Sequence, residues 1–207
     1  MSVLLHNELP QKWWQCSHPV VCLTDLIGLT LSFAALFFID TLFGKLYALI
    51  VIVQFAASIM YHRRYYSERR KVLQSVDHIA IGILILGTPL PYFALSFGSG
   101  FVVWLSAVVS VLLLLAIVLA RGVSIKIAMS SAQGVLFAIS VLVMTTVYSD
   151  LSTASLMFWL GSLLFALQLP LLLIGTKYFN NIVRELQHIF LLLPATQIHV
   201  WLVAYLF

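Results

Sequence analysis

The sequence predicts an all-α membrane protein: a seven-transmembrane helix bundle with the N-terminus in the cytoplasm and the C-terminus outside. Hydrophobic residues make up 62% of the 207 residues and charged residues only 9%, too few to cover the surface of a soluble domain of this size. The apolar residues fall into seven segments, each close to the length of about 20 residues that crosses a bilayer. The basic residues lie in the short connections between these segments.

These spans leave no room for a separate soluble domain, so we expect one transmembrane domain over 20–207 after an interfacial or flexible segment at 1–19. They are too long for barrel strands and lack a two-residue alternation, which leaves helices. The expected spans are Val20–Ile39, Leu46–His62, Val76–Phe97, Phe101–Ala120, Ile127–Tyr148, Ser155–Thr176 and Ile182–Phe207. Proline frees a backbone carbonyl and should bend the span that contains it, at Pro89, Pro91, Pro170 and Pro194.

The basic residues predict the orientation, because cytoplasmic loops carry an excess of lysine and arginine. With the N-terminus and the second, fourth and sixth connections on one side, that side holds every basic residue of the chain except Lys45. We therefore expect a multi-pass protein of a bacterial-type inner or plasma membrane. The net charge of +4 comes from these loops and does not indicate nucleic acid. Cys16 and Cys22 form no paired metal-binding pattern, and their spacing does not imply a disulfide framework.

Polar and ionisable side chains inside a span are costly in lipid, so each is a candidate functional residue. Most of them gather near the cytoplasmic ends of helices 1, 2, 3 and 7. Residues four apart share a helix face, as Ser58 does with His62 and Arg184 with His188. His199 lies about 16 Å along the helix from His188 and should make an interhelical hydrogen bond instead. The candidates are Asp25, Ser58, His62, Asp77, His78, Arg184, Glu185, His188 and His199.

Histidines and carboxylates at one membrane level suggest a metal site. Histidine is the commonest metal ligand for zinc, and a catalytic zinc ion takes three protein ligands and a water. Two histidines, His62 and His188, are well placed, and Asp77 could hold an imidazole ring or accept a proton. Simpler interpretations stay open, because His62 could lie in the interface beside Arg63, and Arg184 could extend to lipid phosphates.

Several segments resemble the progestin and adipoQ receptor superfamily, which includes the bacterial haemolysin III proteins. SIMYH, from Ser58, is similar to the family's S-x-x-x-H at the end of helix 2. VDHIAIGILILGTPLPYF, from Val76, looks like the aspartate, glycine and proline pattern of helix 3. RELQHIFLLLPA, from Arg184, resembles the helix-7 pattern H-E-x-x-H-x-x-x-x-x-x-A. LTDLIG, from Leu23, is a weaker match to the bacterial T-H-x-x-G, in which Asp25 replaces the histidine. The resemblance covers essentially the full chain.

The resemblance implies zinc on the cytoplasmic side, held by one histidine of helix 2 and two of helix 7. It assigns His62 and His188 as metal ligands and matches Asp77 and Ser58 to the family's aspartate and serine. The wider superfamily includes alkaline ceramidases, so the implied activity is zinc-assisted hydrolysis of a lipid amide. Arg184 stands in the place of the remaining histidine ligand, and arginine cannot ligate zinc.

Three functional interpretations stay open. In the first, the site is altered and metal-free, Arg184 pairs with Asp77 or Asp25, and the role is structural, sensing or partner-binding. In the second, the protein is a zinc-dependent lipid amide hydrolase in which Asp77 is the base, Ser58 orients water or substrate, and Asp25 and His78 support the site. The third is a channel or pore-forming protein, which only the haemolysin name suggests. Membrane lipids are the expected partners, and no oligomeric state is predicted.

Overall fold

The computed structural model of the protein describes residues 18–63, 70–96, 156–167 and 185–206. Every regular element in these ranges is a helix, and no strand occurs in them. The predicted all-α class is therefore confirmed for the described part of the chain. The fourth and fifth expected spans, Phe101–Ala120 and Ile127–Tyr148, lie outside the described residues.

Helix α1 (Pro19–Ala35) begins one residue before the expected span, because Pro19 sits in the first turn, where a missing N–H costs little. The helix ends at Ala35 rather than at Ile39, since residues 36–38 form a turn. Hydroxyl side chains inside α1 bond to its own backbone; the Ser32 hydroxyl, for example, donates to the Gly28 carbonyl at 2.7 Å. Such bonds satisfy polar groups that lipid cannot hydrate.

Cys22, near the start of α1, is disulfide-bonded, a bond that the spacing of the two cysteines did not imply. The other cysteine of the chain, Cys16, lies outside the described residues. Spacing alone could not show this bond, because whether a disulfide forms depends on the distance and direction of the two cysteine side chains in the fold.

Helices α2 and α3 extend beyond the expected spans. Helix α2 (Leu42–Arg63) includes Lys45, which we had expected in the preceding connection. Helix α3 (Arg70–Gly87) starts before the expected Val76, so Asp77 lies about two turns inside it rather than at its start. Hydropathy marks the part of a helix that lies in lipid, and lysine and arginine are good helix formers that prolong the helix past that part.

The chain bends after α3, where prolines predicted a bend. Thr88 and Pro89 form a turn, and the short helix α4 (Leu90–Ser96) follows it. Proline cannot donate a backbone hydrogen bond, and its ring clashes with the carbonyl four residues earlier in a regular helix. The Thr88 hydroxyl donates to the Leu84 carbonyl at 2.8 Å, which keeps this polar side chain satisfied at the bend.

The seventh expected span contains a π-helical turn. Residues His188–Leu192 form the turn η1, and Leu193–Leu206 form helix α9. The N–H of Leu193 donates to the carbonyl of His188, five residues earlier. Pro194 explains the wider turn, because its ring would clash with the carbonyl of residue 190 in a regular α-helix. The disturbance predicted for Pro194 is therefore present, and it places His188 at the start of the π turn.

The described helices have the length and composition of membrane spans. Two shorter apolar helices, Pro19–Ala35 and Leu156–Leu167, accompany three that are long and apolar enough to cross a bilayer: Leu42–Arg63, Val72–Ala94 and Glu185–Leu206. Large apolar side chains on these helices point outward; Phe33 on α1, for example, is 54% exposed. A helix surface of this kind is stable in lipid and unfavourable in water, so the membrane assignment holds.

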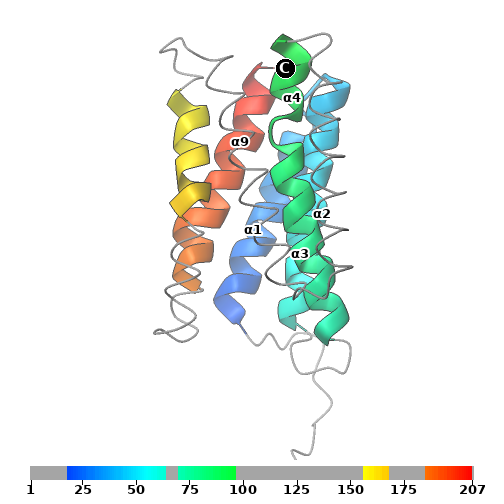
Figure 1. Ribbon diagram of the computed structural model, residues 1–207, viewed down its shortest axis with the longest axis vertical. Helices are drawn as coiled ribbons and strands as arrows, with labels where there is room; N and C mark the ends of the chain where they lie inside the picture. The colour runs from blue at the N-terminus through cyan, green and yellow to red at the C-terminus, as the bar shows by residue number, and fades with distance from the viewer. Residues whose placement is uncertain (1–17, 64–69, 97–155, 168–184, 207) are drawn as a thin grey trace, which may run out of the picture.

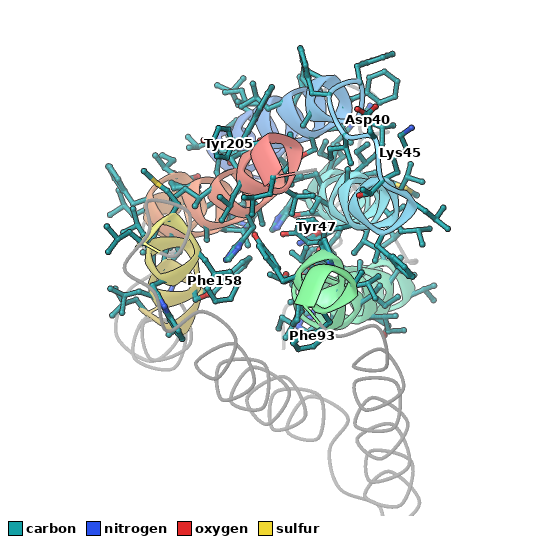
Figure 2. All side chains as sticks on the ribbon, turned by 90° about the horizontal axis from the view of Figure 1, so that it is seen from above. Asp40, Lys45, Tyr47, Phe93, Phe158 and Tyr205 are labelled. Carbon is teal, nitrogen blue, oxygen red and sulfur yellow. The ribbon has the colours of Figure 1, made fainter. Side chains whose placement is uncertain are left out.

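The helices lie side by side in a bundle (Figure 1). Helices α1 and α3 and the turn η1 begin at one end, which is also where α2 ends. Helix α1 packs against both α2 and α9, so segments far apart in the sequence are neighbours. From above, Tyr47 and Phe158 point toward the space between the helices, whereas Asp40 and Lys45 lie at the periphery (Figure 2).

Candidate metal centre at the histidine end

The His62 ring contacts two other histidine rings, from two other segments, at the end of the bundle where α1 begins. The His62 ring, at the end of α2, lies edge-to-face with the His18 ring at a centroid distance of 5.4 Å and with the His188 ring at 5.8 Å. His18, which precedes α1, and His62 are each 3% exposed. We call the place formed by His18, Asp25, His62 and His188 the histidine end.

Asp25 holds the His188 ring in place. The Asp25 side chain, on α1, is 1% exposed, and His188 Nδ1 donates to its Oδ1 at 3.2 Å. A buried carboxylate requires a partner of this kind, because burying an unpaired charge is costly. A neutral ring that donates through Nδ1 keeps its lone pair on Nε2, which is the nitrogen then available to a metal ion. The structure thus joins Asp25, His62 and His188, three of the predicted site residues.

Ser58 and Asp77, the predicted catalytic residues, are both buried. Ser58 lies one turn before His62 on α2 and is 1% exposed, and Asp77 on α3 is 6% exposed. Helices α2 and α3 pack against each other. Both side chains therefore lie inside the bundle, as residues of an internal site must, and their catalytic roles stay predictions.

His78, predicted as a supporting residue, is engaged with its own helix. Its Nδ1 donates to the Gln74 carbonyl at 2.7 Å and lies 3.9 Å from Asp77 Oδ2. Its side chain is 31% exposed, far more than the rings at the histidine end. His78 therefore occupies a more open position than His18 and His62.

Zinc is the metal that the sequence suggests, and the donor types at the histidine end suit it, since imidazole and carboxylate are common zinc ligands. The side-chain positions do not fit a metal ion: within the described ranges, no three His, Cys, Asp or Glu side chains are placed to hold one ion. Arg184 lies outside those ranges, so its pairing with Asp77 or Asp25 stays a prediction.

His199 belongs to a separate buried cluster. It is fully buried on α9, and its Nδ1 lies 3.5 Å from the Tyr92 hydroxyl of α4. Its ring packs edge-on against Phe158 at 5.2 Å and is stacked with Phe165 at 5.9 Å. The interhelical contact predicted for His199 is therefore present and does not involve the histidine end.

His18 and Gln197 contact residues of other helices and were absent from the predicted candidates. His18 was assigned to the flexible N-terminal segment, although Pro19 is a helix-start signal and places His18 at the cap position of α1. Gln197 of α9 donates to the Gly28 carbonyl at 3.1 Å and to the Ser32 hydroxyl at 3.0 Å. A glutamine inside an apolar span was itself a signal, because such a side chain usually bonds to a neighbouring helix.

The comparisons with known proteins give one match. A family model described as haemolysin-III related matches residues 4–199, a range that contains all four residues of the histidine end. Neither the curated proteins nor the solved structures compared with the chain include a match. The matched range also contains the segments on which the resemblance rested.

Proposed function

We propose that this chain, which belongs to the haemolysin-III related family, binds a zinc ion at its histidine end. The observation that carries the proposal is the hydrogen bond from His188 Nδ1 to the buried Asp25 carboxylate, beside the His62 ring. Histidines that bind metals in proteins nearly always give their other nitrogen to a carboxylate, a carbonyl or a water in this way. His62 and His188 are the proposed ligands, and Asp25 is a positioning residue.

The activity we propose for this site is the hydrolysis of a lipid amide. A zinc ion held by His62 and His188 would supply a Lewis acid that activates water and polarises a carbonyl oxygen. Asp77 would act as the base, and Ser58 would orient water or the substrate. The proposal is supported by the burial of both side chains in a helical membrane protein and by the resemblance to a superfamily that includes ceramidases. A lipid substrate would reach the site from the bilayer.

A metal-free relative is the second candidate. It is favoured by the placement of the described side chains, no three of which are set to share one ion. In that case the Asp25–His188 pair would be structural and would hold α1 to η1, and the role would be sensing or partner binding. A pore-forming role gains support from no observation on the described residues.

Metal content separates the two candidates. Purified full-length protein, supplied with zinc in detergent and then dialysed, should hold one zinc ion per chain by mass spectrometry of the metal. His62→Phe and His188→Phe should each lose the ion, while Asp40→Asn, at an exposed position outside the histidine end, should keep it. A wild-type protein that stays free of zinc after this treatment would favour the metal-free relative.

Seven spans, a cytoplasmic N-terminus and a bacterial-type inner membrane complete the proposal. With this orientation, a C-terminal fusion to alkaline phosphatase should be active in a bacterial host, and a C-terminal green fluorescent protein should be dark. The reverse result would place the histidine end outside the cytoplasm.

One observation favours that reverse orientation: Cys22 is disulfide-bonded, and disulfides persist mainly in oxidising compartments. The pair of fusions therefore decides between the orientation that the loop charges predict and the orientation that the disulfide of Cys22 favours.

A further inference from the structure

A glutamine of α2 lies inside the bundle with an unsatisfied side-chain oxygen. Gln54 is 1% exposed, and its Oε1 has no hydrogen-bond partner within the described ranges. A buried carbonyl oxygen without a donor is unfavourable, so most such groups in folded proteins bond to protein or to ordered water. The surroundings of Gln54 therefore have to supply a donor that the described side chains do not.

Gln197 of α9 presents a second acceptor of the same kind. The Ser32 hydroxyl gives its proton to the Gly28 carbonyl, so it can only accept from a further partner. The amide nitrogen of Gln197 donates to both of these oxygens, which fixes the orientation of its side chain. The remaining atom of that amide, Oε1, is buried and has no partner among the described residues.

Both glutamines approach α1 at the level of Gly28. Phe55, the residue after Gln54, packs so closely against Gly28 that a Cβ atom there would lie 2.4 Å from its ring. Gln197 bonds to the carbonyl of the same glycine. Helices α1, α2 and α9 all pack against one another, so the two side chains come to one level of the bundle from two helices.

We propose that Gln54 and Gln197 bind a common ordered water molecule, which is the inner end of a hydrated track that leads to the histidine end. One water molecule can donate a proton to each Oε1 and still accept a third hydrogen bond, and about three bonds are usual for a buried water. The track gives the interior of the bundle a supply of water from the aqueous phase. Any hydrolysis inside the bundle would draw on that supply, whether or not a metal ion takes part.

Polar side chains line the way from this level to the histidine end. On α2, Gln54, Ser58 and His62 are spaced four residues apart, share one face and are each at most 3% exposed. This stripe extends about 12 Å along the helix. On α1, Asp25 lies about one turn from Gly28 toward the same end, and its Oδ2 is a further buried acceptor without a partner in the part of the chain that the structure describes.

A dry amide is the competing explanation, and Gln54→Leu separates the two. Leucine is of similar size but has no hydrogen-bonding group. If Gln54 were dry, the change would remove an unsatisfied polar group and raise the melting temperature in detergent. If Gln54 binds water, the change removes one partner of that water and should lower the melting temperature by about 2–4 °C. A melting temperature at or above the wild-type value overturns the inference.

A double-mutant cycle tests whether the two oxygens share the water. Gln197→Leu should lower the melting temperature more than Gln54→Leu, because it also breaks two direct bonds. The double variant should lose at least about 2 °C less than the sum of the two single losses, because a shared water is lost only once. In the control cycle, Thr30→Val replaces Gln197→Leu, since the Thr30 hydroxyl is exposed and bonds to its own helix, and the losses should add. Additive losses for the two glutamines contradict a shared water.

Hydroxyl-radical footprinting detects the water itself in the full-length protein in detergent. X-ray pulses convert bound water into radicals that oxidise neighbouring side chains, and mass spectrometry locates the added oxygen. Phe55 should be oxidised faster than Phe93, a ring of the same apolar core that is 3% exposed, and Gln54→Leu should remove the difference. Equal rates for the two rings in the wild type overturn the hydrated track. These readouts do not involve metal content, so a failure of this inference is distinguishable from a failure of the proposed zinc binding.

Discussion

Gly28→Val is expected to lower the free energy of unfolding by about 1–3 kcal/mol, the range for overpacking a core. A Cβ atom at Gly28 would lie 2.4 Å from Cζ of Phe55 and 2.6 Å from two further atoms of that ring. Phe55 is 1% exposed, so the ring cannot swing out of the way without disturbing its neighbours. The whole of α1 would have to move away from α2, and this would also strain the bond from Gln197 to the Gly28 carbonyl.

The measurement is the melting temperature in detergent. It is obtained from the amount of protein that stays monodisperse as the sample is heated. Gly82→Val is a matched control, because Gly82 is also a helical glycine and a Cβ there would meet nothing within 4 Å. Both changes alter helix propensity alike, so only the contact differs. Adding Phe55→Leu to Gly28→Val should restore part of the loss. Equal melting temperatures for the two valine variants would contradict the close α1–α2 packing.

Asp25→Asn is expected to weaken zinc binding about 10- to 100-fold, the usual result of removing a carboxylate that holds a metal-bound histidine. The amide is nearly isosteric but carries no charge, so it holds the His188 Nδ1–H less firmly. The metal-free protein should also lose about 1–3 kcal/mol of stability, because a buried hydrogen bond to a charged group is weakened. Chelator competition gives the first quantity, and the melting temperature without metal gives the second.

Asp40→Asn is the matched control for this change. Asp40 allows the same chemical substitution at an exposed position, five residues after α1 ends. It should leave both zinc affinity and melting temperature at the wild-type values. A drop in stability for Asp25→Asn without any zinc binding in the wild type would support the metal-free relative. No change in either quantity would mean that the Asp25–His188 bond contributes nothing measurable.

The helices and much of the candidate site follow from sequence patterns. Apolar length predicts the helices that the described residues form, and assigning loop charges to one side of the membrane predicts a common level for Asp25, His62 and His188. The structure joins these three by a hydrogen bond and a ring contact. These contacts agree with a common level for the three residues, because depth in a bilayer depends on residue counts along each span, which the sequence states directly. Their roles as metal ligands stay predictions.

Other features depend on information that hydropathy does not contain. The start of α3 at Arg70 was missed, because basic residues extend the helix before the apolar stretch begins. His18 was missed because the N-terminal segment was judged by its lack of an apolar run, whereas burial there depends on contact with α2. The π turn at His188 was not predicted, because the sequence shows where Pro194 lies but not how the helix accommodates it. A proline can equally produce a kink.

The hydrogen bond between Asp25 and His188 also constrains the order in which the protein can be assembled. Its two partners are 163 residues apart, and the bond from Gln197 to Gly28 spans 169 residues. The ribosome therefore delivers α1 to the membrane long before the segment that satisfies its carboxylate. Until then, the Asp25 carboxylate must stay hydrated, become protonated or be shielded from lipid by the proteins that insert the chain into the membrane. A chain that stops before residue 188 leaves the Asp25 carboxyl without this partner in the membrane.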